Sequence, residues 1–296
     1  MSGSVFAGVF RPGLFAGQLY VVTGGGSGIG RCIAHELASL GAELVLVGRK
    51  PAKLLRVQAE IVAAGGKAEV EALDIRDEPA VHDCIARIRA RSGRIHGLVN
   101  NAGGQFPSAL ADISKRGFEA VLATNLTGGF LMAREVFAAS MREHGGAIVN
   151  MVADMWNGMP GMAHSGAARA GMVNLTKTAA FEWARYGVRV NAVAPGYIAS
   201  TGLDQYPAPM KQLILSLKDH VPLGRIGLEA EVSSAVCFLL SPAAAFITGV
   251  TLPIDGGAPL GNDLAPLPAA HRTPPAYDVF KLAQRPNVLD DEGGGG

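Results

Sequence analysis

Residues 19–30 read LYVVTGGGSGIG, which is a run of strand-forming residues followed directly by a stretch rich in glycine. The first five residues predict a short buried strand, and the apolar positions Ile29, Ile33 and Leu37 predict a helix after the glycines. Glycine lets the backbone approach a diphosphate closely, and the first turn of a helix offers free N–H groups and a positive dipole end. The segment therefore predicts a nucleotide-binding strand–turn–helix unit.

The same alternation of strand and helix continues outward to residue 257. Further strands are predicted at 43–47, 70–73, 98–100, 147–151, 188–194 and 250–254, and helices at 51–64, 79–88, 118–142, 167–186 and 229–240. Such alternation implies a parallel sheet that is covered by helices on both faces. We therefore expect an α/β fold with one doubly wound Rossmann-type domain and a seven-stranded parallel sheet. It should occupy residues 19–257, between an N-terminal arm (1–18) and a proline-rich C-terminal tail (258–296).

The overall composition excludes several classes of partner. Apolar residues make up 49% of the 296 residues and the net charge is +1, so a large core is possible and nucleic acid is not expected as a partner. Cys32, Cys84 and Cys237 are far apart, which favours a reduced compartment and predicts no metal site. The N-terminus has no basic leader and no apolar run is long enough to cross a membrane, so we predict a cytoplasmic protein.

Four motifs stand in the order that is typical of short-chain dehydrogenases/reductases. TGxxxGxG spans 23–30, NNAG spans 100–103, Asn125 lies in ATNLTGG, and Pro195-Gly196 follows the sixth predicted strand. Over residues 17–257 the chain therefore resembles this family. The resemblance implies a nicotinamide dinucleotide cofactor and a dimer or homotetramer. Such assemblies pair through the fourth and fifth helices and build a second contact with the last strand.

The cofactor residues follow from the glycine turn and from the family pattern. Arg49 lies about twenty residues past the turn, where a carboxylate would suit NAD and an arginine suits the 2′-phosphate of NADP, so NADP(H) is favoured over NAD(H). The family contacts adenine at the places of Asp74 and Ile75. The predicted cofactor-binding residues are Thr23, Gly24, Ser27, Gly28, Ile29, Gly30, Arg49, Asp74, Ile75, Asn101, Ala102, Gly103, Arg169, Pro195, Gly196 and Ile198.

The stretch HSGAARAGMVNLTK at 164–177 departs from the common form of the family. That form has a catalytic tyrosine four residues before a lysine, and those places hold Ser165 and Arg169 here. Its upstream serine falls on residue 152 or 153, where neither side chain can donate, and only Asn125 is retained. Ser165 and Arg169 share a helix face and can hold a developing oxyanion, although an arginine is no proton source.

The same stretch, together with SSAVCFLLSPAAAFITG near the C-terminus, resembles the branch of peroxisomal trans-2-enoyl-CoA reductase. The related 2,4-dienoyl-CoA reductases also have serine at the tyrosine place. This resemblance implies hydride transfer from NADPH to an activated double bond and stabilisation of a thioester enolate. The dienoyl-CoA reductases keep the lysine that is Arg169 here, and they have a tyrosine eleven residues before the serine, where this chain has Asp154.

The sequence leaves alternatives for the proton donor and for the residues that line the substrate site. Asp154 is the predicted catalytic acid, with His164 and Tyr197 as further candidates, and each of them could instead have a structural role. Trp156 and the methionines at 155, 159 and 162 suggest an adaptable apolar wall for an acyl or isoprenoid chain, or else ordinary loop packing.

Three functions remain as hypotheses. The leading one is an NADP(H)-dependent reductase of the 2,3 double bond of an enoyl-CoA, with Ser165, Arg169, Asn125 and Asp154 as catalytic residues. The second is a dehydrogenase of a hydrophobic alcohol or aldehyde, such as an acyclic terpenoid like citronellol. The third, from another class, is a nucleotide-binding protein with little catalysis.

Overall fold

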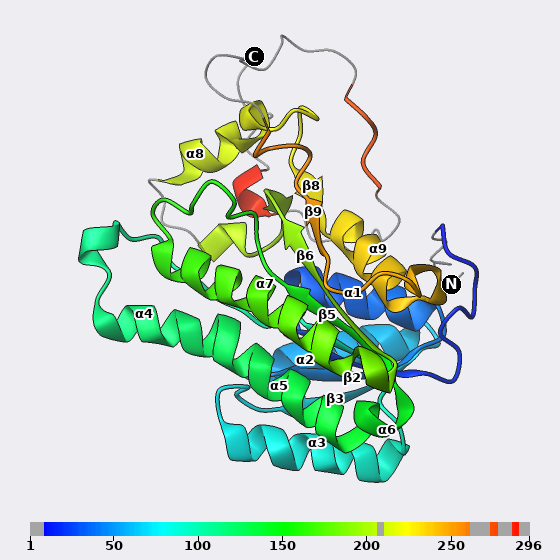
Figure 1. Ribbon diagram of the computed structural model, residues 1–296. Coiled ribbons are helices and arrows are strands. Elements are labelled where there is room, and N and C mark those ends of the chain that lie inside the picture. Colours follow the sequence, from blue (N-terminus) through cyan, green and yellow to red (C-terminus); the bar gives the residue numbers. More distant parts are fainter. Residues whose placement is uncertain (1–8, 206–209, 261–272, 278–285, 290–296) are drawn as a thin grey trace.

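A seven-stranded parallel sheet forms the centre of the computed structural model, which describes residues 9–205, 210–260, 273–277 and 286–289 (Figure 1). The strand order is β3-β2-β1-β4-β5-β6-β9, and every neighbouring pair is parallel. This confirms the predicted doubly wound fold. The strands are β1 (Leu19–Thr23), β2 (Glu43–Gly48), β3 (Lys67–Ala72), β4 (Gly97–Asn100), β5 (Gly146–Met151), β6 (Val188–Pro195) and β9 (Thr251–Ile254).

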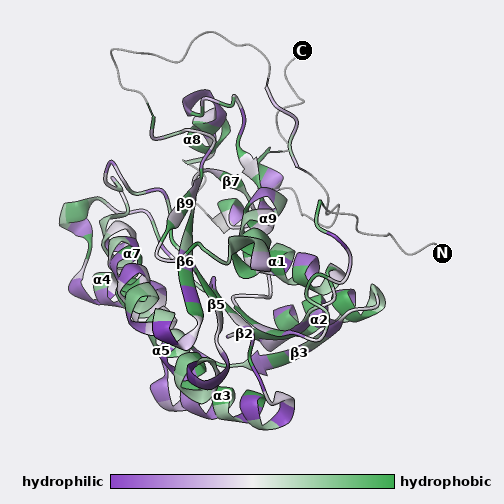
Figure 2. Cartoon of the chain, turned by 45° about the vertical axis from the view of Figure 1, so that its right-hand side comes forward, coloured by the Kyte–Doolittle hydropathy of each residue, from purple (hydrophilic) through white to green (hydrophobic). Residues whose placement is uncertain are grey.

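Helices cover both faces of the sheet, and each face has its own apolar core (Figures 1 and 2). One face carries α1 (Gly28–Ser39), α2 (Pro51–Ala63) and α9 (Glu229–Leu240). The other carries α3 (Glu78–Ser92), α5 (Gly128–Val136) and α7 (Ala163–Trp183). Helix α4 (Lys115–Leu122) precedes α5 and packs against α7, and the short α6 (Arg142–His144) follows α5. The strand order reverses between β1 and β4, which is where such sheets open a crevice for a dinucleotide.

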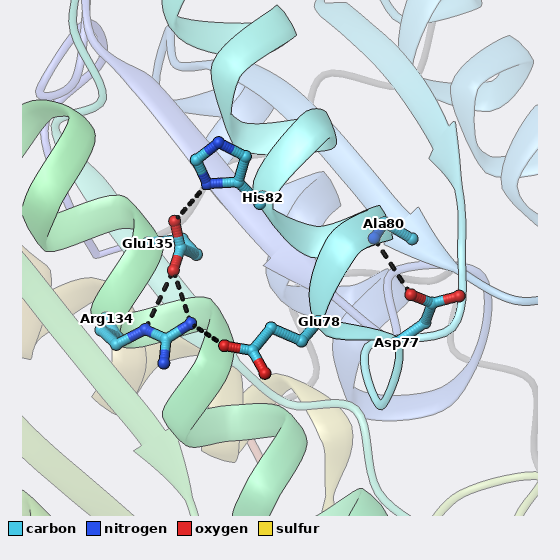
Figure 3. Close-up of polar contacts among 6 residues, drawn as sticks. All are labelled: Asp77, Glu78, Ala80, His82, Arg134 and Glu135. Atoms are coloured by element: carbon cyan, nitrogen blue, oxygen red, sulfur yellow. Dashed lines mark hydrogen bonds and ion pairs between the residues drawn. The ribbon is translucent and has the colours of Figure 1, made fainter.

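Surface ion pairs join α3 to α5 at the edge of the second layer (Figure 3). Asp77 caps α3 by accepting the backbone N–H of Ala80, and Arg134 donates to both Glu78 and Glu135. The contact between Arg134 and Glu78, which joins the two helices, is exposed, so it contributes at most about 1 kcal/mol. The apolar core below them therefore holds the two helices together.

The structure differs from the prediction in three places. Helix α7 begins at Ala163, four residues before the predicted start, so Ser165 lies in its first turn. The predicted helix 118–142 is one helical run over 115–144 that contains two π-helical turns, at 123–127 and 137–141. The third difference is a set of short elements between β6 and α9, which were too short to show a periodic pattern: β7 (Ile198–Ala199), α8 (Lys211–Ser216) and β8 (Gly227–Leu228). We call the described residues 198–205 and 210–228 the cap.

The segment before β1 packs against the domain. Phe15 is fully buried beside Tyr20, and its backbone N–H bonds to the carbonyl of Leu40. The described half of the predicted N-terminal arm is thus part of the first core. Within the described residues, no helix has the length and apolar character that crossing a membrane requires.

Candidate active site

The glycine turn after β1 is fixed by side chains from two strands. Thr23 Oγ1 accepts the backbone N–H groups of Asn101 and Ala102 at 3.0 Å, and Asn101 Nδ2 donates to the carbonyl of Thr23. A Cβ atom on Gly24 would lie 2.7 Å from Asn101 Nδ2, and one on Gly30 would collide with the same group. The predicted motifs at 23–30 and 100–103 therefore form one interlocked unit at the carboxyl ends of β1 and β4.

The first turn of α1 fits an anionic group. Ser27 is the N-cap residue, yet its side chain caps no backbone N–H, and the first turn contains no acidic residue. The N–H groups at Gly28 and Ile29 therefore form the positive end of the helix dipole, and no acidic residue of the first turn occupies it. This is the arrangement that would hold the diphosphate of a dinucleotide.

Two cations lie at the carboxyl ends of β2 and β3. The Oδ2 atom of Asp74 accepts two hydrogen bonds from the guanidinium of Arg76. Arg76, with a smaller contribution from Arg49, lowers the pKa of Asp74. Arg49 is exposed directly after β2. Ile75 is buried against Gly128 of α5, so its side chain belongs to the core and only its backbone can serve a ligand.

Ser165 meets a residue that the sequence did not single out. Its hydroxyl is fully buried and donates to Gln105 Oε1 at 2.7 Å, while Gln105 itself is exposed at the mouth of the site. Gln105 lies in the loop that follows NNAG, and no periodic pattern marks such a position. This hydrogen bond joins the first turn of α7 to the loop after β4.

Arg169 is a buried cation that has no counter-ion in the part of the chain that the structure describes. Its side chain is 9% exposed, Nη1 donates to the carbonyl of Met151 at 2.6 Å, and Nε has no partner among the described residues. Burial lowers the pKa of its guanidinium to about 10, which still leaves it charged at neutral pH. A Cβ on Gly103 would lie 2.7 Å from Arg169 Nη2, so the guanidinium lies directly against the NNAG turn. An unpaired buried charge of this kind is costly unless a ligand completes it.

Asn125 anchors the loop that carries Gln105. It lies in the first π-helical turn, and its amide both accepts from the backbone N–H of Gly104 at 2.8 Å and donates to the carbonyl of Gly104 at 2.9 Å. The widened turn directs this side chain out of the helix toward the loop, as π-turns at functional sites commonly do. Asn125 therefore acts on the site by fixing the loop between β4 and α4.

Asp154 lies beside the turn formed by Pro195 and Gly196. Its backbone N–H bonds to the carbonyl of Pro195, and burial, with a smaller contribution from Asp255, raises the pKa of its carboxyl. Gly196 lies close against Asp255, and Ile198 is buried at the start of the cap. The structure thus brings Asp154 and the predicted PG turn together at the carboxyl ends of β5 and β6.

The other candidate acids have different surroundings. His164 is fully buried, its Nδ1 accepts the backbone N–H of Ser165 at 2.9 Å, and its ring packs edge-on against Phe106 at 4.4 Å between centroids. Tyr197 is 41% exposed and follows the PG turn. His164 therefore holds the first turn of α7 and the Phe106 loop together, whereas Tyr197 is accessible to a ligand.

The predicted apolar wall is divided between surface and core. Trp156 is 46% exposed, and Met159 packs closely against Gly166 of α7. Met155 instead joins a small buried cluster with Val152. Only part of the predicted wall is therefore available to a substrate.

Two further buried carboxyls lie behind the glycine turn, between α1 and α9. Ser233 donates a hydrogen bond to Glu36, while Glu229 lies next to Gly28. Both carboxyls are almost fully buried, and each has one oxygen with no hydrogen-bond partner among the described residues. Burial raises the pKa of each carboxyl to about 7. No sequence pattern marks these two carboxyls as buried, because a glutamate on a helix is usually exposed.

Comparison with known proteins agrees with this geometry. Residues 24–259 match a family model described as Enoyl-(Acyl carrier protein) reductase. The chain belongs to the short-chain dehydrogenase/reductase family.

Three relatives illustrate the range of activities in the family. The chain is 34% identical over 240 residues to a probable 2,4-dienoyl-CoA reductase of Bacillus subtilis, covering 80% of this chain and 94% of that protein. It is 35% identical over 250 residues to gluconate 5-dehydrogenase of Gluconobacter oxydans, covering 83% and 97%. A solved structure, citronellol catabolism dehydrogenase of Pseudomonas aeruginosa PAO1, is 61% identical with a TM-score of 0.77, covering 84% of this chain and 98% of that one. Membership of this family indicates an oxidoreductase that uses NAD(P)(H) and acts on a small molecule.

Proposed function

We propose that the protein reduces the 2,3 double bond of an enoyl-CoA thioester with NADP(H). The observation that carries this proposal is the buried pair on the first turns of α7: Ser165, which is bonded to Gln105, and Arg169 one helical turn later, a buried cation with no counter-ion among the described residues. These groups suit an oxyanion, and none of them is a proton source of the kind that carbonyl reduction requires.

The residues would share the work as follows. The bound nicotinamide would supply hydride to the β carbon, and negative charge would then develop on the thioester oxygen. Ser165, whose position the hydrogen bond to Gln105 fixes, and the charge of Arg169 would stabilise that oxygen. The proton for the α carbon would come from Asp154, whose raised pKa favours the protonated acid.

NADP(H) rather than NAD(H) is part of the proposal. It is supported by the exposed Arg49, which follows β2 at the place where an NAD-binding member would have a carboxylate. A second cation, Arg76, is bonded to Asp74 after β3. Replacing Arg49 with alanine should raise the KM for NADPH about tenfold or more and leave the KM for NADH nearly unchanged. Equal effects on both cofactors would contradict this assignment.

A second candidate is the oxidation of a hydrophobic alcohol such as citronellol. It is favoured by the 61% identity to citronellol catabolism dehydrogenase, and it would need a proton acceptor in place of the absent tyrosine. The nucleotide-binding hypothesis without catalysis has no comparable support.

One experiment separates these functions. Purified protein is given straight-chain and branched enoyl-CoAs with NADPH, and citronellol and related alcohols with NADP⁺ and NAD⁺, while absorbance of the reduced cofactor is followed. We expect turnover of the enoyl-CoAs alone. Oxidation of the alcohols without reduction of any enoyl-CoA would overturn the first proposal in favour of the second, and cofactor binding without turnover would overturn both.

Assembly through the face formed by α5 and α7 is also part of the proposal. A shallow groove of about 330 Å³ lies there, lined by Leu126, Thr127, Phe130, Gly171, Asn174, Leu175 and Thr178. Small and apolar side chains at matching helical positions suit close packing against a second copy of the chain. Light scattering after size-exclusion chromatography would test for a dimer or tetramer. The cytoplasmic location stays a prediction.

A further inference from the structure

The C-terminal tail returns to the body of the protein in its described parts. Residues 273–277 run beside α9, where the carbonyl of Pro274 accepts from Arg225 and the hydroxyl of Tyr277 accepts the backbone N–H of Val9. Residues 286–289 form a short helical turn that lies against the cap, drawn in red beneath α8 in Figure 1. We call residues 286–289 the anchor segment.

Leu289 is the buried side chain of the anchor segment. It is 7% exposed and forms a small apolar cluster with Ala199 of β7 and Ile214 of α8. The partly buried members of this cluster are Leu203, Met210, Leu215, Leu217, Ile226, Leu228 and Val288. Apart from the anchor segment, every member of the cluster belongs to the cap, and the cluster is separate from the two cores of the sheet.

Polar contacts fix the orientation of the same segment. Asp204 of the cap accepts the backbone N–H of Val288 at 3.1 Å and the side-chain amide of Asn287 at 3.4 Å. The backbone N–H of Leu289 closes the turn onto the carbonyl of Pro286 at 3.0 Å. The anchor segment is therefore seated in a defined register on the cap.

The cap is also joined to the rest of the protein by Ile198, which belongs to the first core, and by the ion pair of Arg225 with Glu231 of α9. Its strands have two residues each and α8 has six, which is too short for a helix to be stable by its own hydrogen bonds. The cap begins directly after the PG turn, beside Asp154, at the carboxyl ends of the strands where ligands bind in such folds. The family match ends at residue 259, so the anchor segment lies outside the shared part of the chain.

We propose that Leu289 is a positioning residue that holds the cap over the substrate side of the site, so that the C-terminal tail contributes to binding of the substrate. Loss of Leu289 would loosen the cap and weaken substrate binding, while the groups around Ser165 and Arg169 would be undisturbed. The inference rests on the proposed function only for the identity of the substrate.

The test compares Leu289→Ala with Leu260→Ala, which removes an exposed leucine from the same tail. Hydrogen–deuterium exchange of cap residues 212–220 is measured on the full chain with NADPH and without substrate. Exchange in Leu289→Ala should be about tenfold faster than in wild type. The KM for whichever substrate wild type turns over in the panel should rise about fivefold or more, with kcat within about twofold. Leu260→Ala should match wild type, and Leu289→Met, which keeps the volume, should restore both values.

The two measurements distinguish the possible failures. Exchange rates equal to those of wild type in Leu289→Ala would overturn the docking of the anchor segment, whatever the substrate is. Faster exchange with an unchanged KM would overturn its role in substrate binding. If wild type oxidises citronellol and reduces no enoyl-CoA, the proposed function fails, while the KM for citronellol still decides the role of Leu289.

Discussion

The cofactor half and the substrate half of the site are built in different ways. Around the glycine turn, Thr23 and Asn101 position backbone N–H groups, and the shape of the backbone makes the site. Around Ser165 and Arg169, side chains carry the donors, and each depends on a partner from a distant element. A site made of backbone keeps its sequence motif because only certain residues allow its shape, whereas a site made of side chains can change its chemistry by substitution.

The largest effect should come from Arg169, because it bears directly on the charge of the substrate half. Arg169→Met should lower kcat/KM for an enoyl-CoA about 10³-fold, because the buried positive charge that would stabilise the oxyanion is lost. Steady-state kinetics and NADPH titration test this expectation. Arg169→Lys, which keeps the charge, should retain more activity. Equal kcat/KM values for Arg169→Met and wild type would show that the charge of Arg169 does not stabilise the oxyanion.

The Ser165–Gln105 pair should have the next largest effect. Gln105→Ala and Ser165→Ala should each lower kcat about 10²-fold, and the double variant should be little worse, because the two side chains are hydrogen-bonded to each other and hold one arrangement. Additive losses in the double variant would show that the two residues act independently. Binding of NADPH should be unchanged in all three variants, which separates the substrate half from the cofactor half.

The buried carboxyls behind the glycine turn should affect stability rather than rate. Their pKa values are about 7 in the folded protein, whereas an ordinary glutamate has a pKa of 4.5. The folded state therefore binds more protons than the unfolded state between these pH values. Their stabilising contribution is therefore complete below pH 4.5 and is lost as pH rises through 7, by at most about 3 kcal/mol for each group.

Glu36→Gln and Glu229→Gln should accordingly make the free energy of unfolding less dependent on pH between 5 and 8. Urea unfolding at several pH values measures this change. Glu143→Gln, at an exposed position, is the matched control and should behave as wild type. A decline in stability between pH 5 and 8 that persists in both buried variants would show that other groups cause it.

The smallest effect is expected at Asp154. Asp154→Asn should lower kcat about tenfold rather than more, because water can replace a half-buried acid in protonating carbon. Since an acid must be protonated to donate, the wild-type rate should fall as pH rises through its raised pKa, and this fall should be absent in Asp154→Asn. An unchanged pH–rate profile in the variant would assign the proton to another source, such as Tyr197.

Much of the fold and the cofactor half could be predicted from particular residues. The glycines at 24 and 30 admit no side chain because Asn101 lies against them, so their pattern alone predicts the turn. In the substrate half the sequence found Ser165, Arg169 and Asn125, but it missed Gln105. The contact between residues 105 and 165 spans sixty positions and leaves no local pattern.

The sequence by itself determined the strand–helix alternation, the nucleotide turn and the substitutions at 165 and 169, because these depend on local propensity and on the shape of a turn. The packing of distant segments showed that Ser165 is bonded to Gln105, that Arg169 is buried with no counter-ion among the described residues, and that Leu289 closes the cluster of the cap. The physical reason is that burial and pairing depend on which distant segments pack together, and a side chain acquires its chemistry from that packing.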